Sequence, residues 1–204
     1  MSAALPVIVA VTGASGAPYA VRLLEALLAA QRMVWLVISS HGWRLLEVES
    51  DIRDVSELRE QLGSANWDNL VTVFDDADRG ATPASGSALN AGMVICPCSM
   101  GTLAAISTGA SRSLVERAAD VALKERRRLI LVPRETPLSA IHLENMLRVT
   151  RAGATVLPAA PGFYHRPSEI TQLVDFVVAR VLDHLGVDHQ LGRRWNAGED
   201  AEGD

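Results

Sequence analysis

The chain has few residues of the kinds that mark secreted, membrane-spanning or nucleic-acid-binding proteins. Only two of its 204 residues are cysteines, Cys96 and Cys98, and they lie too close together to link distant elements. No apolar run approaches the ~18 residues that indicate a membrane span, and a net charge of −5 does not favour general nucleic-acid binding. The apolar run at residues 7–11 follows no basic region and ends in a glycine loop, so we expect no signal peptide. These features favour a cytoplasmic protein with reduced thiols.

Common nucleotide and metal motifs are also missing. No Gly-Lys-Ser/Thr follows Gly16, and the loop before it lacks the G-x-G-x-x-G spacing. The second apolar run ends in Ile38-Ser39-Ser40, without the carboxylate that would hold an adenosine ribose. The cysteine pair and the five histidines have no metal-ligand spacing. We therefore expect no metal and no dinucleotide, and we expect both cysteines to be buried for packing.

What the sequence does contain is a strand, a turn of small residues and a helix at its start. Val7 to Val11 predicts a buried strand, Thr12-Gly13-Ala14-Ser15-Gly16 a tight loop, and residues 20–30 a helix with Pro18 in its first turn. Backbone N–H groups at such a helix start make an anion site. A tight turn without a ligand would give the same pattern, so this loop alone does not show whether an anion binds there.

The same alternation of strand and helix continues along the chain. Short apolar runs indicate strands, and helical spacing separates them, which is the pattern of a parallel sheet covered on both faces. The sequence therefore predicts an α/β fold, a flavodoxin-like (Rossmann-like) doubly wound parallel sheet in three α/β/α layers. We expect a single domain at residues 1–192 and a polar C-terminal tail at 193–204. The further strands are expected at 34–38, 70–74, 93–96, 129–132 and 154–157. The further helices are expected at 43–49 and 55–62, through 106 after the fourth strand, at 113–124 with Ser113 and Glu116 as a capping box, and at 139–151 and 168–185.

Polar residues follow several of these strands. Ligands of open α/β sheets bind beyond the carboxyl ends of the strands, where residues 12–16, Ser39 and residues 99–102 would meet. Serines there suit a phosphate or a flavin ribityl chain better than an adenosine ribose. A flavin mononucleotide is the economical interpretation, although other phosphates remain open.

Positive charge gathers between Arg112 and Arg134, with seven cations against three acids. Arg117, Asp120 and Lys124 recur at helical spacing and share one face. This excess of cations suggests a small anionic ligand. The alternative is a surface pair of Asp120 and Lys124, which would contribute little to stability. In the last helix, Arg180 lies on an apolar stripe, so we expect its stem to be buried.

Seven motifs follow one another along nearly the whole chain. They are T-G-A-S-G-A-P-Y (12–19), P-A-S-G-S (83–87), M-V-I-C-P-C-S-M-G-T-L (93–103), E-R-A-A-D-V-A-L-K-E-R-R (116–127), L-V-P-R-E-T-P (131–137), H-L-E-N-M (142–146) and P-A-A-P-G-F-Y-H-R-P (158–167). In this combination and order, the sequence resembles the UbiX flavin prenyltransferases.

That resemblance implies a specific activity. Members of the family bind FMN and join a dimethylallyl group, mostly from dimethylallyl monophosphate, to N5 and C6 of its reduced form. The product, prenylated FMN, is used by UbiD-type decarboxylases, and the resemblance also implies a connection with ubiquinone biosynthesis. The family is metal-independent and forms homododecamers. One segment departs from the family pattern, since Asp78-Arg79-Gly80-Ala81 stands where an aromatic residue often lines the prenyl pocket.

The resemblance also implies roles for individual residues. Ser15 would hydrogen-bond near N5 with Glu49 as its proton partner, and Glu135 would aid proton transfer or fix the cations. FMN would be held by Gly13, Ala14, Ser15, Ser39, Ser99, Met100, Gly101, Thr102 and Arg134. The donor would be held by Ser85, Arg117, Lys124, Tyr164 and Arg180.

Two other functions fit parts of the sequence. An FMN-dependent cysteine decarboxylase has a similar fold, but that class uses a P-A-S-A-N-T loop and a Met-Asn clamp where this chain has P-A-S-G-S and P-R-E-T-P. A non-catalytic FMN carrier would need no second anion site, and the basic stretch at 112–134 disfavours it.

Overall fold

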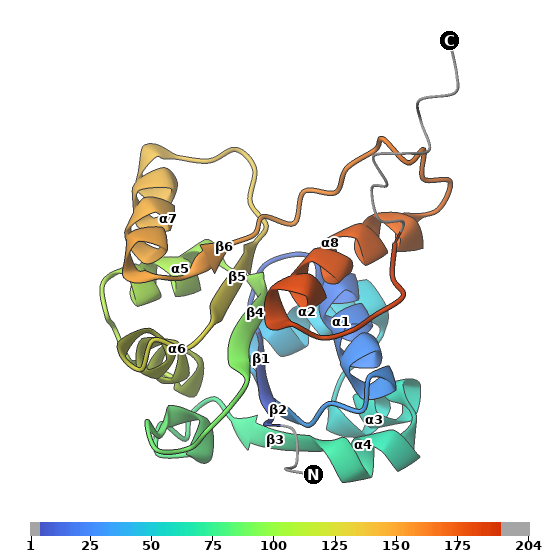
Figure 1. Ribbon diagram of the computed structural model, residues 1–204, viewed down its shortest axis with the longest axis horizontal. Coiled ribbons are helices and arrows are strands. Elements are labelled where there is room, and N and C mark those ends of the chain that lie inside the picture. Colours follow the sequence, from blue (N-terminus) through green and yellow to red (C-terminus); the bar gives the residue numbers. More distant parts are fainter. Residues whose placement is uncertain (1–4, 193–204) are drawn as a thin grey trace.

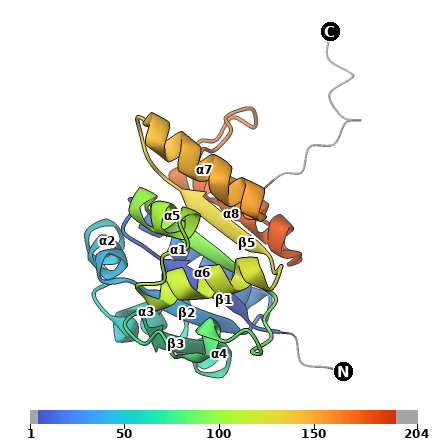
Figure 2. The ribbon, with the colours of Figure 1, turned by 90° about the vertical axis from the view of Figure 1, so that its left-hand side faces the viewer.

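The computed structural model describes residues 5–192 as a parallel sheet between two layers of helices (Figures 1 and 2). All strand pairs are parallel, in the order β3-β2-β1-β4-β5-β6. This order is Rossmann-like, with the winding direction changing between β1 and β4. The expected doubly wound three-layer fold is confirmed. The strands are β1 (Val7–Val11), β2 (Val34–Ile38), β3 (Val71–Asp75), β4 (Gly92–Cys98), β5 (Leu129–Pro133) and β6 (Thr155–Val156).

The helices divide between the two faces of the sheet (Figures 1 and 2). On one face α1 (Ala17–Ala29) packs against α8 (Ile170–Leu185), α2 (Ser40–Ser50), α3 (Val55–Leu62) and α4 (Ser64–Leu70). The opposite face is covered by α5 (Met100–Ser107), α6 (Leu114–Lys124) and α7 (Ala140–Ala152). A single 3₁₀ turn, η1 (Thr82–Ala84), lies against α6 within the long loop that follows β3.

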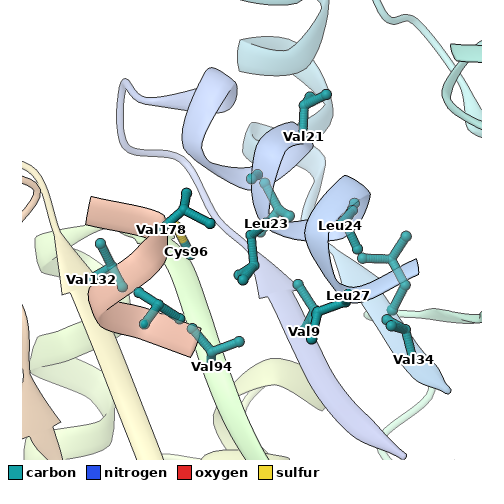
Figure 3. Close-up of a cluster of buried hydrophobic side chains, with 14 of the residues drawn as sticks. Val9, Val21, Leu23, Leu24, Leu27, Val34, Val94, Cys96, Val132 and Val178 are labelled. Atoms are coloured by element: carbon teal, nitrogen blue, oxygen red, sulfur yellow. The ribbon is translucent and has the colours of Figure 1, made fainter. Parts of the chain in front are cut away.

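The buried side chains of the strands alternate between two cores, as the period of two in a strand requires. In β1, Val7, Val9 and Val11 face the α1–α8 side, while Ile8 and Ala10 face the other side. The core on the α1–α8 side joins alternate residues of several strands to the two helices (Figure 3). Residues that meet there include Val9, Val34, Val94, Val132, Leu23, Leu24, Leu27 and Val178.

Both cysteines lie in β4 and are fully buried, on opposite faces of the sheet. They are free thiols. Burial raises the pKa of Cys96 to about 12, and it raises that of Cys98 still further. Both thiols therefore stay protonated, and the expected packing role is confirmed.

The element boundaries differ from the expected ones in a few places. Helix α1 begins at Ala17, three residues earlier than expected, with Pro18 in its first turn. Helix α4 was not expected, because residues 64–70 have no apolar period and bury only Trp67. The expected capping box of α6 is only half formed. Ser113 accepts from the Glu116 N–H, but the Glu116 carboxylate binds Arg112 and does not reach back to Ser113.

Gly42 offers a test of how tightly α2 is seated on the sheet. A Cβ there would lie 2.5 Å from the Val11 carbonyl oxygen, a backbone atom that cannot turn aside. In a helix interior, Gly→Ala normally stabilises by up to about 1 kcal/mol. Here overpacking of about 1–3 kcal/mol opposes that gain, so we expect Gly42→Ala to lower the melting temperature.

Gly101→Ala is the matched control for this prediction. Gly101 lies in α5, and the nearest atom to its added Cβ would be Ser99 Oγ at 3.9 Å. Thermal melts at equal protein concentration, without ligand, should show Gly101→Ala unchanged or more stable. A Gly42→Ala protein that melts as high as the wild type would contradict the close seating of α2.

Candidate active site

The loop between β1 and α1 forms the centre of the site. Thr12, 2% exposed, links it to the end of β4, because its hydroxyl donates to the Pro97 carbonyl at 3.0 Å and accepts from Ser99 N–H at 2.8 Å. Gly13 lies against α2, where a Cβ would meet the Cβ of His41 at 2.5 Å. Only glycine fits there, so the close packing of this loop on α2 depends on Gly13.

Glu49 occupies the start of α1. One oxygen of its carboxylate accepts from the N–H groups of Gly16 and Ala17, both at 2.8 Å. These donors are the ones expected to form an anion site, and in this structure the anion that they bind is the carboxylate of Glu49. Burial opposes ionisation of Glu49, but hydrogen bonds from Gly16, Ser15 and Ala17 and the charge of Arg134 outweigh it, and the pKa is lowered.

Arg134 ties the end of β5 to the same loop. Its Nε donates to the Ser15 carbonyl oxygen at 3.0 Å. The structure thus joins three of the expected residues, Ser15, Glu49 and Arg134, in one network around residues 15–17. The expected contact of Arg134 with a bound flavin remains a prediction.

A cleft of about 390 Å³ opens beside this loop, and we call it the strand-end cleft. Three helices begin at its wall, α2, α5 and α6, and the first N–H groups of α6 are already bound by Asp76 and Ser113. Ser39 caps α2 by accepting from Gly42 N–H at 3.1 Å, and Ser99 caps α5 by accepting from Thr102 N–H at 3.1 Å. Two helix N-termini favour an anion between them. The residues that line the cleft are Thr12, Gly13, Ser39, Ser40, His41, Asp76, Ser99, Thr102, Ser113, Val115 and Glu116.

Four of the expected flavin ligands line this cleft: Gly13, Ser39, Ser99 and Thr102. The others lie next to it. Ala14 and Ser15 continue the loop after Gly13, and Met100 and Gly101 form the first turn of α5. This clustering follows from the parallel sheet, which brings the carboxyl ends of β1, β2 and β4 together.

Several lining residues were not among the expected ones. Asp76 follows β3, and its carboxylate accepts from Val115 N–H at 2.9 Å, which fixes the start of α6. Glu116, 7% exposed, holds the Arg112 guanidinium at 2.8 Å. The rule that polar residues after a strand share one edge could have identified Asp76. For Glu116, no local sequence signal distinguished a place in the wall of the cleft from a role in capping α6.

A second cavity, of about 300 Å³, lies along α8, and we call it the α8 cavity. Tyr164 and Arg180 both line it, so the structure brings together two of the expected donor ligands. The Tyr164 ring meets the edge of Phe176 at 5.8 Å between centroids. The Arg180 side chain is 55% exposed, more open than its place on the apolar stripe predicted.

The remaining donor candidates lie on the other face of the sheet. Lys124 ends α6 and pairs with Glu125. The loop with Ser85 lies against it, since a Cβ on Gly86 would be 2.9 Å from the Lys124 ammonium. Arg117, on the same helix, pairs with Asp120 at 3.2 Å, so the alternative of an Asp120–Lys124 pair is wrong.

One subunit therefore does not assemble the expected donor site. Ser85, Arg117 and Lys124 belong to the α6 face, whereas Tyr164 and Arg180 belong to the α8 face. Glu135 follows β5 next to Arg134, is exposed, and accepts from Thr136 N–H at 3.1 Å. The sheet itself separates the two groups of cations.

Among residues 5–192, no three His, Cys, Asp or Glu side chains come together in a way that could hold a metal ion. Within the same range, no helix combines the length and apolar character needed to cross a membrane.

Glu49→Gln tests the lowered pKa. Because the folded state lowers the pKa of Glu49 below its ordinary value of 4.5, the ionised carboxylate stabilises the fold above that pH. This contribution is lost as the pH falls through the folded-state pKa. Melting temperatures should therefore be lower for Glu49→Gln than for the wild type at about pH 7, and the difference should shrink as the pH falls below the ordinary pKa of a glutamate. A difference for Glu49→Gln that stays constant with pH would contradict the assignment.

Comparison with known proteins gives consistent results. The Flavoprotein family model matches residues 1–182. The flavin prenyltransferase UbiX of Pseudomonas aeruginosa is 50% identical over 202 residues, 96% of each chain. The crystal structure of AnUbiX (PadA1) in complex with FMN and dimethylallyl pyrophosphate has a TM-score of 0.88 at 43% identity, covering 96% of this chain and 100% of that one.

A third relative is a dodecameric FMN-dependent UbiX-like decarboxylase from Escherichia coli O157:H7. It has a TM-score of 0.86 at 44% identity, covering 94% of this chain and 100% of that one. Identity of this extent, with the same fold over nearly the whole length, shows common descent. The chain belongs to the Flavoprotein family and, within it, to the UbiX flavin prenyltransferases.

Proposed function

We propose that this chain joins the dimethylallyl group of dimethylallyl phosphate to N5 and C6 of reduced FMN. One new bond, to N5, replaces the carbon–oxygen bond of the donor as phosphate leaves and the N5 proton is lost. The other, to C6, would form as the double bond of the dimethylallyl group takes up a proton and C6 loses one, and the prenylated FMN serves a UbiD-type decarboxylase. The observation that carries the proposal is the presence of two distinct polar cavities, the strand-end cleft and the α8 cavity. A transfer from a phosphate donor to a flavin needs one site for each.

The strand-end cleft fits FMN. Its wall offers two helix N-termini, capped by Ser39 and Ser99, for a phosphate, and Gly13 lines it without a side chain. When bound, reduced FMN supplies the two nucleophilic atoms. We assign its binding to Gly13, Ala14, Ser15, Ser39, Ser99, Met100, Gly101, Thr102 and Arg134.

Ser15 and Glu49 are suited to move a proton at the flavin edge. Glu49 stays ionised at neutral pH, because its pKa is lowered, and it interacts with the Ser15 hydroxyl. The carboxylate therefore orients Ser15 and accepts a proton through it only transiently. Glu135 lies beside Arg134 at the end of β5 and would assist from that side.

The donor ligands act on the leaving phosphate. Negative charge grows on its oxygen as the bond breaks, and preorganised cations stabilise that charge more than the ground state. We assign this role to Lys124, Tyr164 and Arg180, with Ser85 and Arg117 nearby.

Assembly follows from where these residues lie. Lys124 is on the α6 face and Arg180 on the α8 face of the same sheet, so neighbouring subunits must contribute them to a common site. We propose a homo-oligomer, and a dodecamer like that of the E. coli relative.

Neither alternative function accounts for both cavities. A carrier of FMN needs no α8 cavity with Tyr164 and Arg180. A cysteine decarboxylase would need its own substrate clamp, and residues 133–137 read P-R-E-T-P in its place.

The proposal extends to domain organisation and location. Residues 1–192 would form a single FMN-binding domain, and the polar tail at 193–204 lies outside the described residues. A cytoplasmic location agrees with the two unpaired thiols in β4.

Variants of the donor ligands should separate binding from turnover. Arg180→Ala and Tyr164→Phe should bind FMN with near-normal affinity but make prenylated FMN about 10²–10³ times more slowly, because each removes a donor that acts on the leaving phosphate. Arg134→Ala should weaken FMN binding itself, since its guanidinium fixes the loop at Ser15. FMN titration and the mass and absorbance of the extracted flavin measure the two effects. Loss of FMN binding in Arg180→Ala with normal turnover of the bound fraction would show that the donor site is placed wrongly.

Mixing two inactive variants tests the shared site. Lys124→Ala and Arg180→Ala subunits, dissociated and reassembled together, should regain activity, because some sites then receive Lys124 from one variant and Arg180 from the other. With random assembly of two contributing subunits, roughly a quarter of the sites should be intact. Each variant reassembled alone is the control. No recovery in the mixture, with mixed oligomers verified by mass, would mean that one subunit supplies both residues.

A further inference from the structure

A chain of three hydrogen bonds ends at Arg180. Its Nη1 donates to Asp183 Oδ2 at 3.1 Å. The other oxygen of that carboxylate, Oδ1, lies 3.2 Å from His189 Nε2, and His189 Nδ1 accepts from Leu191 N–H at 3.1 Å. Asp183 and His189 line the α8 cavity together with Tyr164 and Arg180.

The bond from Leu191 determines which ring nitrogen of His189 carries a proton. A nitrogen that accepts from a backbone N–H has no hydrogen of its own, so the proton of the neutral ring is on Nε2. There it donates to Asp183. The side chain of His189 is only 6% exposed, so its bond to Asp183 is partly enclosed, whereas the Arg180 end of the chain of bonds is open to solvent.

The turn after α8 is what brings His189 to Asp183. Gly186 ends the helix with φ of 70°, a left-handed conformation that glycine adopts without strain. The chain then turns back alongside α8 (Figure 1). Val187, 5% exposed, anchors the returning segment in the core, and its N–H bonds to the Leu182 carbonyl at 3.0 Å.

We propose that Asp183 and His189 are positioning residues that hold the Arg180 guanidinium ready for the donor phosphate. This inference rests on the proposed function, which assigns Arg180 to that phosphate. Arginine has a long side chain with many rotamers, so fixing it before the donor arrives reduces the entropy lost on binding. The bond to Asp183 uses Nη1, and it does not use the Nε–Nη2 edge, which matches two phosphate oxygens.

Asp175 provides the control for this idea. It lies on the same helix and forms two hydrogen bonds with Arg22, at 2.6 and 3.3 Å. Asp175→Asn therefore breaks an Arg–Asp pair of α8 without touching the α8 cavity. A merely structural role for Asp183 predicts that Asp183→Asn and Asp175→Asn behave alike.

The test measures prenylated FMN formation by the full-length chain as a function of dimethylallyl phosphate concentration. Asp183→Asn and His189→Leu should lower kcat/KM for the donor roughly 10-fold to 10²-fold, with FMN affinity unchanged, because they misplace a group that acts on the phosphate. His189→Gln should restore most of it, since its amide can donate to Asp183 and accept from Leu191. Asp175→Asn should keep wild-type kcat/KM, whatever it does to the melting temperature.

A double variant distinguishes a failure of this inference from a failure of the proposed function on which it rests. If Asp183 acts through Arg180, adding Asp183→Asn to Arg180→Ala should cause no further loss. Arg180→Ala with normal kcat/KM would overturn the donor assignment itself. Two results would overturn the positioning role alone. In the first, Arg180→Ala has a lowered kcat/KM while Asp183→Asn has the same kcat/KM as Asp175→Asn. In the second, the losses of the two single variants multiply in the double variant.

Discussion

The contact of the Glu49 carboxylate with the start of α1 determines how the site is arranged. A helix N-terminus leaves backbone donors without partners, and Glu49 satisfies those of Gly16 and Ala17 from a different helix. The contact anchors the loop at Ser15, where Arg134 binds from the other side. It also removes α1 as a phosphate site. An anionic ligand is left with the starts of α2 and α5, which open on the strand-end cleft.

The parallel sheet imposes the second constraint. All its strands end at one edge, so the residues proposed to bind the flavin gather within a single subunit. The helices between strands must lie on either face, and the cations that they carry are thereby divided. Lys124 and Arg180 can serve one phosphate only if subunits come together. Oligomerisation is, on this view, a requirement of the chemistry and not an addition to a complete active site.

How far the sequence predicts this structure depends on the range of each interaction. The strands and the fold follow from local apolar runs. Because the carboxyl ends of parallel strands share one edge, the sequence also places Gly13, Ser39 and Ser99 together correctly. The contact of Glu49 with α1 joins residues more than thirty positions apart, and nothing in the local pattern indicates it. Helix α4 has no apolar period because one tryptophan supplies its buried contact. The division of the donor ligands between two faces needs the topology, which spacing alone does not contain.

The side chains that line the two cavities differ in conformational freedom, and this difference explains why Arg180 needs neighbours that hold it in place. The strand-end cleft is lined mostly by glycine and by short serine and threonine side chains, which lose little freedom when a ligand binds. The α8 cavity relies on a long arginine that is more than half exposed. Its preorganisation must come from neighbours, and the turn at Gly186 supplies one in His189. With the proposed role of Arg180, the end of the last helix, remote in the sequence from the flavin-binding loops, would bear on the chemistry through the position of a single guanidinium.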